Sequence, residues 1–194
     1  MERKETLEDG TKVIMKYFSP KDLNNIIEFY INLLPENDAY LRVDGKNRKA
    51  VDYRAGTGEF GDIIHIIAIH GEDIVADGAL ELLLDEQHRH DAELRVIVAK
   101  RFRHRGLGTI MMKELCLLAE QNKVDRLVVK LTKPQIAAQT ICKKLGFHEE
   151  PPTPGLTPNQ NGEILDFIMM TTKVKDFWKE LEHLYLDFDW QRFR

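Results

Sequence analysis

The fold of this chain is decided by one short stretch, Arg103-His104-Arg105-Gly106-Leu107-Gly108-Thr109. It follows a run of strand-forming residues, 94–98, and opens a segment with helical periodicity that extends to about Gln121. A helix N-terminus attracts anions, because its first N–H groups have no intrahelical partner and the helix dipole is positive there. Gly106 and Gly108 carry no Cβ, so an anion can approach the backbone closely. Further positive charge comes from Arg101, Arg103 and Arg105, and the stretch therefore predicts a phosphate-binding loop.

The glycine spacing distinguishes three kinds of phosphate loop. The P-loop pattern is absent, because no Gly-Lys-Ser/Thr follows. The dinucleotide pattern GxGxxG fails, because Met111 stands where the third glycine is needed. The pattern Gln/Arg-x-x-Gly-x-Gly/Ala does match, through Arg103, Gly106 and Gly108. Taken alone, this short pattern also fits an ordinary turn with a solvated basic surface.

A second informative element lies downstream of the loop. Residues 137–145 have the spacing of an amphipathic helix and lead into Leu145-Gly146-Phe147. Gly146 stands where the residue after a helix adopts the left-handed conformation, and Phe147 is expected to start the next strand. A β-rich run, 125–132, lies between the two elements. The predicted order is strand, loop, helix, strand, helix and Gly-Phe.

Together the two elements resemble the signatures of the GCN5-related N-acetyltransferase (GNAT) superfamily, whose pyrophosphate loop binds acetyl-CoA. The resemblance covers about residues 61–170. It implies an α/β (α+β) GNAT fold, with a mixed, mostly antiparallel twisted sheet of about six or seven strands flanked by helices. It also implies a single GNAT domain over residues 1–174. Residues 175–194, rich in aromatic side chains, are expected to form a helical extension that packs on the domain or at a dimer contact.

Hydrophobic periodicity and capping residues predict the remaining elements. A helix is expected to start with Ser19 as its N-cap and Pro20 at its first position, and to end at Pro35. We expect a loop near the acceptor site over residues 36–60, and a proline-rich loop over 150–163. Strands are predicted at residues 10–18, 63–69, 74–84, 92–98 (the fourth strand) and 165–174.

The composition excludes several classes of protein. With 194 residues, 43% hydrophobic and 31% charged, the chain can bury the core of one globular domain. Its net charge of −4 argues against a general nucleic-acid binder. No apolar run approaches the roughly 20 residues of a membrane span, and the charged start lacks the apolar segment of a signal peptide. We therefore expect a cytoplasmic protein without nucleic-acid or membrane partners.

Cysteine and histidine usage points to neither a disulfide nor a metal. The two cysteines, Cys116 and Cys142, both fall in predicted helices, and a reducing compartment is the default for such a chain. His88-Arg89-His90 lies in a polar turn, without a helical HxxxH pair or a cysteine cluster. A solvated turn explains these histidines, and we expect no metal.

The resemblance implies which residues hold acetyl-CoA. In GNAT proteins the strand before the loop and the strand after the next helix splay apart, which leaves backbone groups for the pantetheine amides. Those groups would come from Val96 and Val98, with Ile97 between them. The N–H groups of Arg103, His104, Arg105, Gly106, Leu107, Gly108 and Thr109 would face the pyrophosphate, and Gln135 takes the place of a frequent cofactor-contacting Asn.

Two residues are candidates for catalysis. An acceptor amine with a pKa of about 10.4 arrives charged at neutral pH, so it needs a base. Glu93 is placed for this role by its resemblance to a strand of bacterial protein-lysine acetyltransferases, with a structural carboxylate as the alternative; Glu81 and Asp85 are reserve candidates. Many GNAT proteins carry a Tyr acid where this chain has Cys142. A thiol can donate a weak hydrogen bond to the leaving sulfur, or it can simply pack as a small apolar residue.

The resemblance thus predicts an acetyl-CoA-dependent N-acetyltransferase that acts by direct attack of a primary amine in a ternary complex. The strand around Glu93 favours a protein lysine as acceptor, and a small amine or amino acid is the alternative. A module that senses CoA without turnover is the rival from another class, and a homodimer is compatible with the aromatic C-terminal segment.

Overall fold

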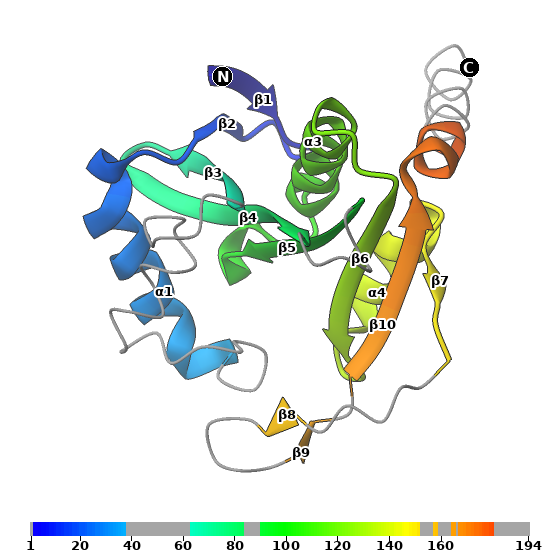
Figure 1. Ribbon diagram of the computed structural model, residues 1–194. Helices are drawn as coiled ribbons and strands as arrows, with labels where there is room; N and C mark the ends of the chain where they lie inside the picture. Colours follow the sequence, from blue (N-terminus) through cyan, green and yellow to red (C-terminus); the bar gives the residue numbers. More distant parts are fainter. Residues whose placement is uncertain are drawn as a thin grey trace, which may run out of the picture.

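The computed structural model describes residues 2–37, 63–83, 90–151, 157–158, 164–165 and 167–180. Within this part of the chain, eight strands form one twisted sheet in the order β1-β2-β3-β4-β5-β6-β10-β7 (Figure 1). All neighbours pair antiparallel except β5 and β6, which run parallel. A small second sheet pairs β8 (Thr157–Pro158) with β9 (Ile164–Leu165). The strands of the large sheet are β1 (Glu2–Thr6), β2 (Lys12–Tyr17), β3 (Ile63–His70), β4 (Asp73–Leu83), β5 (Asp91–Val98), β6 (Arg126–Thr132), β7 (His148–Glu149) and β10 (Phe167–Lys173).

Helices cover both faces of this sheet. Helix α3 (Leu107–Gln121) packs against one face of β4 and β5, and α1 (Leu23–Asn37) contacts β4 from the other face (Figure 1). α4 (Ile136–Lys144) follows β6, and residues 174–180 are helical after β10. None of the described helices is long and apolar enough to cross a membrane. A mixed, mostly antiparallel sheet flanked by helices is the predicted fold class, which is confirmed.

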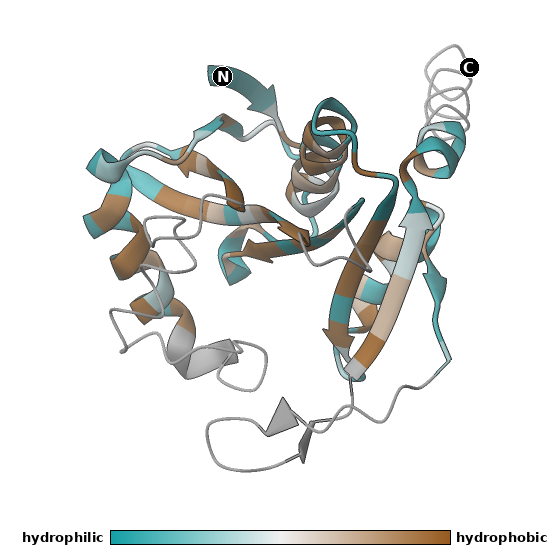
Figure 2. Cartoon of the chain, in the orientation of Figure 1, coloured by the Kyte–Doolittle hydropathy of each residue, from teal (hydrophilic) through white to brown (hydrophobic). Residues whose placement is uncertain are grey.

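The hydrophobic core is accordingly divided by the sheet. On the α3 side it contains Ile66 and Leu94, and on the α1 side it contains Ile67 together with Ile26 and Tyr30. Because β3 is buried on both faces, its sequence reads as a nearly continuous apolar run rather than an alternating one. Figure 2 shows hydrophobic residues along the central strands and on the helices that pack against them.

The helix boundaries follow from local chemistry. Ser19 caps the first turn: its N–H and hydroxyl both donate to Asp22 Oδ2, at 3.0 and 2.7 Å. That turn is a 3₁₀ helix, η1 (Pro20–Asp22), and the α-helix follows directly. The prediction that Pro35 ends the helix is wrong, because α1 continues to Asn37. A proline disrupts the turn before it, and residues after it can still keep helical dihedrals.

The predicted Gly146 terminus is confirmed. Gly146 has a φ of +79°. Its N–H donates to the Lys143 carbonyl at 3.1 Å, and the Phe147 N–H donates to the Cys142 carbonyl at 3.0 Å. These two bonds form a Schellman motif, which closes α4. Phe147 itself is buried in the core, and β7 begins one residue later than expected, at His148.

One strand was missed, and it shifts the strand count. β1 has the sequence Glu-Arg-Lys-Glu-Thr, and it pairs with β2 at the edge of the sheet. A strand made of polar residues gives no hydrophobic alternation, so periodicity could not find it. The segment predicted as the fourth strand is therefore β5, and the sheet exceeds the expected six or seven strands. The last predicted strand ends one residue early, because Val174 is already helical. Most of the predicted loops 36–60 and 150–163, together with Asp85 and His88, lie outside the described residues.

Candidate active site

The feature that organises the site is the separation of β5 from β6. The two strands are paired at only three positions, Asp91 with Arg126, Ala92 with Leu127 and Glu93 with Val128. Beyond Glu93 the strands diverge, while β5 stays paired with β4 as far as Val98 (Figure 1). On this side of β5, none of the described strands pairs with it beyond Glu93. The predicted splay of these two strands is therefore present, and it begins at Glu93.

The register with β4 shows which backbone groups face the open edge. The Ala99 N–H donates to the Val75 carbonyl at 2.9 Å, which makes this a hydrogen-bonded pair. Antiparallel pairs alternate, so Ile97 also bonds to β4, whereas Val96 and Val98 direct their N–H and C=O groups away from it. Of the three predicted pantetheine contacts, Val96 and Val98 thus present backbone groups at the edge. Ile97 does not, and the Val98 carbonyl already accepts a bond from Arg103 Nε at 3.0 Å.

The predicted phosphate loop has the backbone of a strand-to-helix turn. After β5 the chain makes a 3₁₀ turn, η2 (Lys100–Phe102), and passes through positive φ at His104 and Gly106, +58° and +82°. Gly106 is the N-cap of α3, and Ile110 N–H is the donor to its carbonyl, at 3.1 Å. The N–H groups of residues 107–109 therefore precede the first intrahelical bond. The N–H of Arg103 lies outside this group, since it donates to the Lys100 carbonyl at 3.2 Å.

The arginines of the loop are held by partners within the chain. Arg101 pairs with Asp73 at 2.6 Å, at a site where both side chains are more than half exposed. Arg105 pairs with Asp9 at 2.7 Å and lies over the Phe102 ring. Exposed ion pairs of this kind are weak, so an anionic ligand can compete for these arginines. Their charge is nevertheless partly balanced, which the sequence did not indicate.

An acidic turn between β1 and β2 lies against the loop. The Glu8 N–H donates to the Arg105 carbonyl at 3.1 Å. The Glu8 carboxylate comes within 2.9 Å of the point that a Cβ on Gly106 would occupy. A side chain at Gly106 would therefore meet Glu8. A Cβ on Gly108 would make only ordinary contacts with Ile141 and Val98, at 3.7 and 3.8 Å, which agrees with a pattern that accepts Gly or Ala there.

The candidate base lies where the strands part. Glu93 belongs to the last paired position of β5 and β6, and its side chain is 9% exposed. Its Oε2 accepts a hydrogen bond from Lys130 Nζ at 2.6 Å. Glu81 stands opposite Glu93 on β4 and pairs with Arg95, whose Nη2 lies 3.3 Å from Glu81 Oε2. The structure thus brings Glu93 and the reserve candidate Glu81 together.

The other predicted site residues, Cys142 and Gln135, belong to α4 and its N-cap. Cys142 is 3% exposed and belongs to the same core cluster as Cys116, and burial raises the pKa of its thiol to about 12. Gln135 is the N-cap of α4, and its Oε1 accepts bonds from the Thr132 N–H and hydroxyl, at 2.7 and 3.1 Å. Within the described part of the chain, no three His, Cys, Asp or Glu side chains are placed to hold a metal ion.

A buried polar network next to this site was missed by the sequence analysis. Asp77 on β4 accepts short hydrogen bonds from the Tyr30 hydroxyl and from His65 Nε2. Burial alone would raise the pKa of Asp77, but the attraction of His65 and the hydrogen bonds outweigh it and lower that pKa. Tyr30 and Asp77 are 47 residues apart in the chain, so no local pattern links them.

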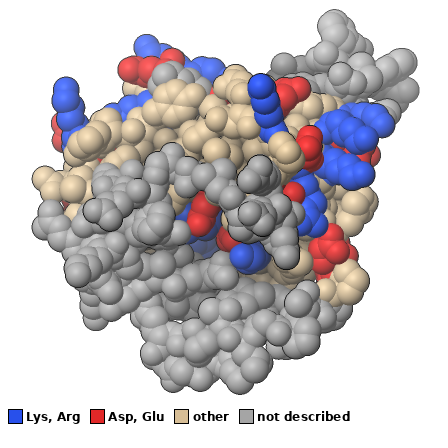
Figure 3. All heavy atoms as spheres, viewed as in Figure 1, with Lys and Arg blue, Asp and Glu red and all other residues tan. Residues whose placement is uncertain are grey.

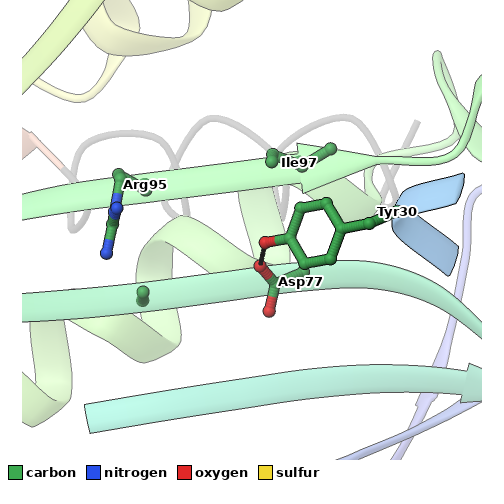
Figure 4. Close-up of a pocket in the computed structure, with 5 residues that line it drawn as sticks. Tyr30, Asp77, Arg95 and Ile97 are labelled. Atoms are coloured by element: carbon green, nitrogen blue, oxygen red, sulfur yellow. Dashed lines mark hydrogen bonds between the residues drawn. The ribbon is translucent and has the colours of Figure 1, made fainter. Parts of the chain in front are cut away.

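The network borders a small cavity on the α1 face of the sheet. Its volume is about 10 Å³, and it is lined by Tyr30, Asp77, Ala79, Arg95 and Ile97 (Figure 4). Side chains alternate along β5, so Glu93 and Arg95 lie on the same face as Ile97. Figure 3 shows acidic and basic side chains close together in the middle of the face seen in Figure 1.

Comparison with known proteins agrees with this geometry. Residues 61–149 match the family model "Acetyltransferase (GNAT) domain". The GNAT domain of S. lividans PAT superposes with a TM-score of 0.72 at 14% identity, covering 89% of this chain and 96% of that one. A ribosomal-protein-alanine N-acetyltransferase from Brucella melitensis gives 0.65 at 23% identity, covering 82% and 98%.

A further solved structure carries a ligand. A protein from Salmonella typhimurium, solved with its cofactor acetyl-CoA, gives a TM-score of 0.65 at 19% identity and covers 84% of this chain and 94% of that one. No curated protein sequence matches the chain. The fold, the two sequence signatures and the family match over residues 61–149 together support an assignment of this chain to the GNAT superfamily.

Proposed function

We propose that this protein is an acetyl-CoA-dependent N-acetyltransferase that acetylates a primary amine by direct attack in a ternary complex. The observation that carries the proposal is the divergence of β5 and β6 beyond Glu93, with the anion-binding loop at the other end of the same open edge. From Glu93 to Val98 the strand rises by five residues, or roughly 17 Å. A long ligand bound along this edge would have its phosphate end at the loop and its reactive end at Glu93.

The residues present fit such a ligand. The N–H and C=O of Val96 and the N–H of Val98 can pair with amides as an added strand would. The N–H groups at the start of α3 can bind a diphosphate, because they are oriented along the helix axis and carry its partial positive charge. The Salmonella relative solved with acetyl-CoA supports the same assignment.

The reaction requires the protein to position the two substrates and to supply a base. When bound, acetyl-CoA supplies a thioester, whose C–S bond breaks as the amine nitrogen forms the new amide bond. The ammonium of the acceptor must first lose a proton. We assign the removal of this proton to the Glu93 carboxylate, which accepts it directly or through one water. The hydrogen bond from Lys130 Nζ, at 2.6 Å from Glu93 Oε2, holds this carboxylate in place.

Cys142 remains a candidate donor to the leaving sulfur. A pKa of about 12 keeps its thiol protonated at neutral pH, as a donor must be. Its near-complete burial beside other core residues supports the alternative, in which Cys142 serves packing alone. The proposed reaction does not depend on it, because a thiolate product can take its proton from water.

The test is a thiol-release assay with acetyl-CoA and a broad panel of primary amines, amino acids and lysine peptides. We expect release that depends on the amine and yields the N-acetyl product by mass spectrometry. Calorimetric titration with acetyl-CoA runs beside it. Tight binding of acetyl-CoA without release for any acceptor would contradict the proposal and favour a CoA-sensing module.

A further inference from the structure

The group that calls for an explanation is the guanidinium of Arg95. Its Nε and Nη2 atoms are buried and have no hydrogen-bond partner among the described residues. Its ion-pair partner is Glu81, at 3.3 Å from Nη2. A guanidinium presents five N–H donors in a rigid plane, and buried donors are normally satisfied. Arg95 is therefore arranged to bind something that the described residues do not supply.

The surroundings of Arg95 limit what this can be. The neighbouring carboxylate, Asp77, already accepts bonds from Tyr30 and His65. Figure 4 shows the Arg95 side chain reaching from β5 toward β4, beside the cavity that Tyr30 and Asp77 also line. At about 10 Å³ this cavity has room for one water molecule or one ligand oxygen. An acceptor oxygen that displaces such a water would meet the unsatisfied donors.

The charged side chains on this face of the sheet indicate which other groups the ligand carries. Glu81 and Glu93 stand opposite each other on β4 and β5, and Arg95 follows Glu93 by two residues on the same face. Two residues of strand span roughly 7 Å. A ligand here meets carboxylates at one end, which favour an ammonium, and a guanidinium at the other, which favours a carboxylate. A simple anion would be repelled by Glu81 and Glu93, and a simple amine would leave Arg95 unsatisfied.

We propose that Arg95 binds the carboxylate of the acetyl acceptor, and that the acceptor is therefore a small zwitterion of the α-amino acid class. This inference rests on the proposed function, since it places the acceptor amine beside Glu93. One carboxylate oxygen in the cavity can accept from both Nε and Nη2 of Arg95, and such charge-assisted bonds fix orientation as well as affinity. With its carboxylate held at Arg95, the acceptor has its amine directed back along β5 toward Glu93.

The experiment compares matched acceptors in the thiol-release assay. For each amino acid side chain, the free acid, its carboxamide and its decarboxylated amine are measured with the wild-type enzyme. The best free acid should exceed its two analogues in kcat/KM by about 10- to 100-fold, the usual effect of one charge-assisted pair. The Arg95→Gln variant should lose that preference, so that its kcat/KM for the acid is no higher than its kcat/KM for the amide.

Two further variants guard against a trivial result. Arg95→Lys keeps the charge but not the paired donors, so its preference for the acid should be intermediate. Arg126→Gln removes an arginine of the same sheet that pairs with Asp91, and it should keep the full preference. Calorimetric affinity for acetyl-CoA should be the same in all four proteins.

The outcomes separate this inference from the proposed function. Turnover of amines or lysine peptides that equals or exceeds turnover of free amino acids would overturn the role of Arg95 and leave the acetyltransferase standing. An Arg95→Gln variant that loses activity equally on acid, amide and amine would show a merely structural role and overturn it as well. Absence of thiol release with every acceptor would overturn the proposed function itself.

Discussion

The predicted phosphate loop after β5, residues 103–109, is built from consecutive residues, whereas the polar cluster along one face of β5 is assembled from separate elements. This loop would bind an anion through its backbone N–H groups and needs glycines at fixed spacing. The polar cluster draws its members from α1, β3, β4 and β5, and they are Tyr30, His65, Asp77, Glu81, Glu93 and Arg95. A ligand that many proteins share can be bound by a local motif, while a ligand specific to one protein is recognised by side chains that only the fold brings together.

The largest effect should come from the polar cluster, through the candidate base. Glu93→Gln keeps the shape of the side chain but removes the proton acceptor, so kcat should fall by about 10²- to 10⁴-fold. The acetyl-CoA affinity should change little, because the loop and the edge of β5 are untouched. Steady-state kinetics across pH, with calorimetry for the cofactor, measures both. An unchanged pH–rate profile would move the base elsewhere, with Glu81 as the next candidate.

Within the same cluster, substitution of Asp77 should have a large effect on the free energy of unfolding. Removing one partner of a buried ionic network costs about 3–5 kcal/mol, so Asp77→Asn should lower the free energy of unfolding by that order. The matched control is Asp73→Asn, which breaks an exposed pair with Arg101 and should cost little. Urea denaturation of the two variants and the wild type gives the difference.

The pH dependence of this effect has a definite sign. The pKa of Asp77 is lowered in the folded protein, so its ionisation stabilises the fold above the ordinary carboxyl pKa of about 3.9. That contribution is lost as the pH falls below this value toward the folded-state pKa. The gap between wild type and Asp77→Asn should therefore be constant near neutrality and narrow below about pH 4. A gap that widens on acidification would contradict an ionised Asp77.

Substitution of the glycines in the predicted phosphate loop should have smaller effects on stability and on acetyl-CoA binding. Gly106 has a φ of +82°, so Gly106→Ala should cost about 1–2 kcal/mol of stability and weaken acetyl-CoA binding as the turn relaxes. Gly108→Ala should be neutral or stabilising by about 0.5–1 kcal/mol, because the position is helical and the added methyl meets only ordinary contacts. Thermal unfolding and calorimetry on the pair test this. Equal losses in both variants would contradict the assigned roles.

The same contrast explains what the sequence could predict. The loop, α3, the Gly146 terminus and the strands before them follow from capping, glycine placement and periodicity, which are local. β1 was missed because its residues are polar, and the end of α1 was misplaced because a proline limits a helix less strictly at its last turn. Within the site, Glu93 could be proposed from its place on a strand. The Lys130 partner of Glu93, the exposure of Arg95 to a cavity and the Tyr30–Asp77–His65 network depend on pairing between distant segments.

The smallest effect concerns the contact between the acidic β1–β2 turn and the loop. The Glu8 carboxylate lies beside Gly106, where it would repel a diphosphate bound at the loop. Glu8→Gln should therefore strengthen acetyl-CoA binding by about two- to threefold at low salt, and the gain should shrink as salt screens the charge. Glu5→Gln, on β1 and paired with Arg3, is the control and should leave the affinity unchanged. If Glu8→Gln weakens acetyl-CoA binding instead, the carboxylate stabilises the loop rather than repelling the anion. The affinity of the loop for acetyl-CoA would then depend on this contact as well as on the glycine and arginine pattern.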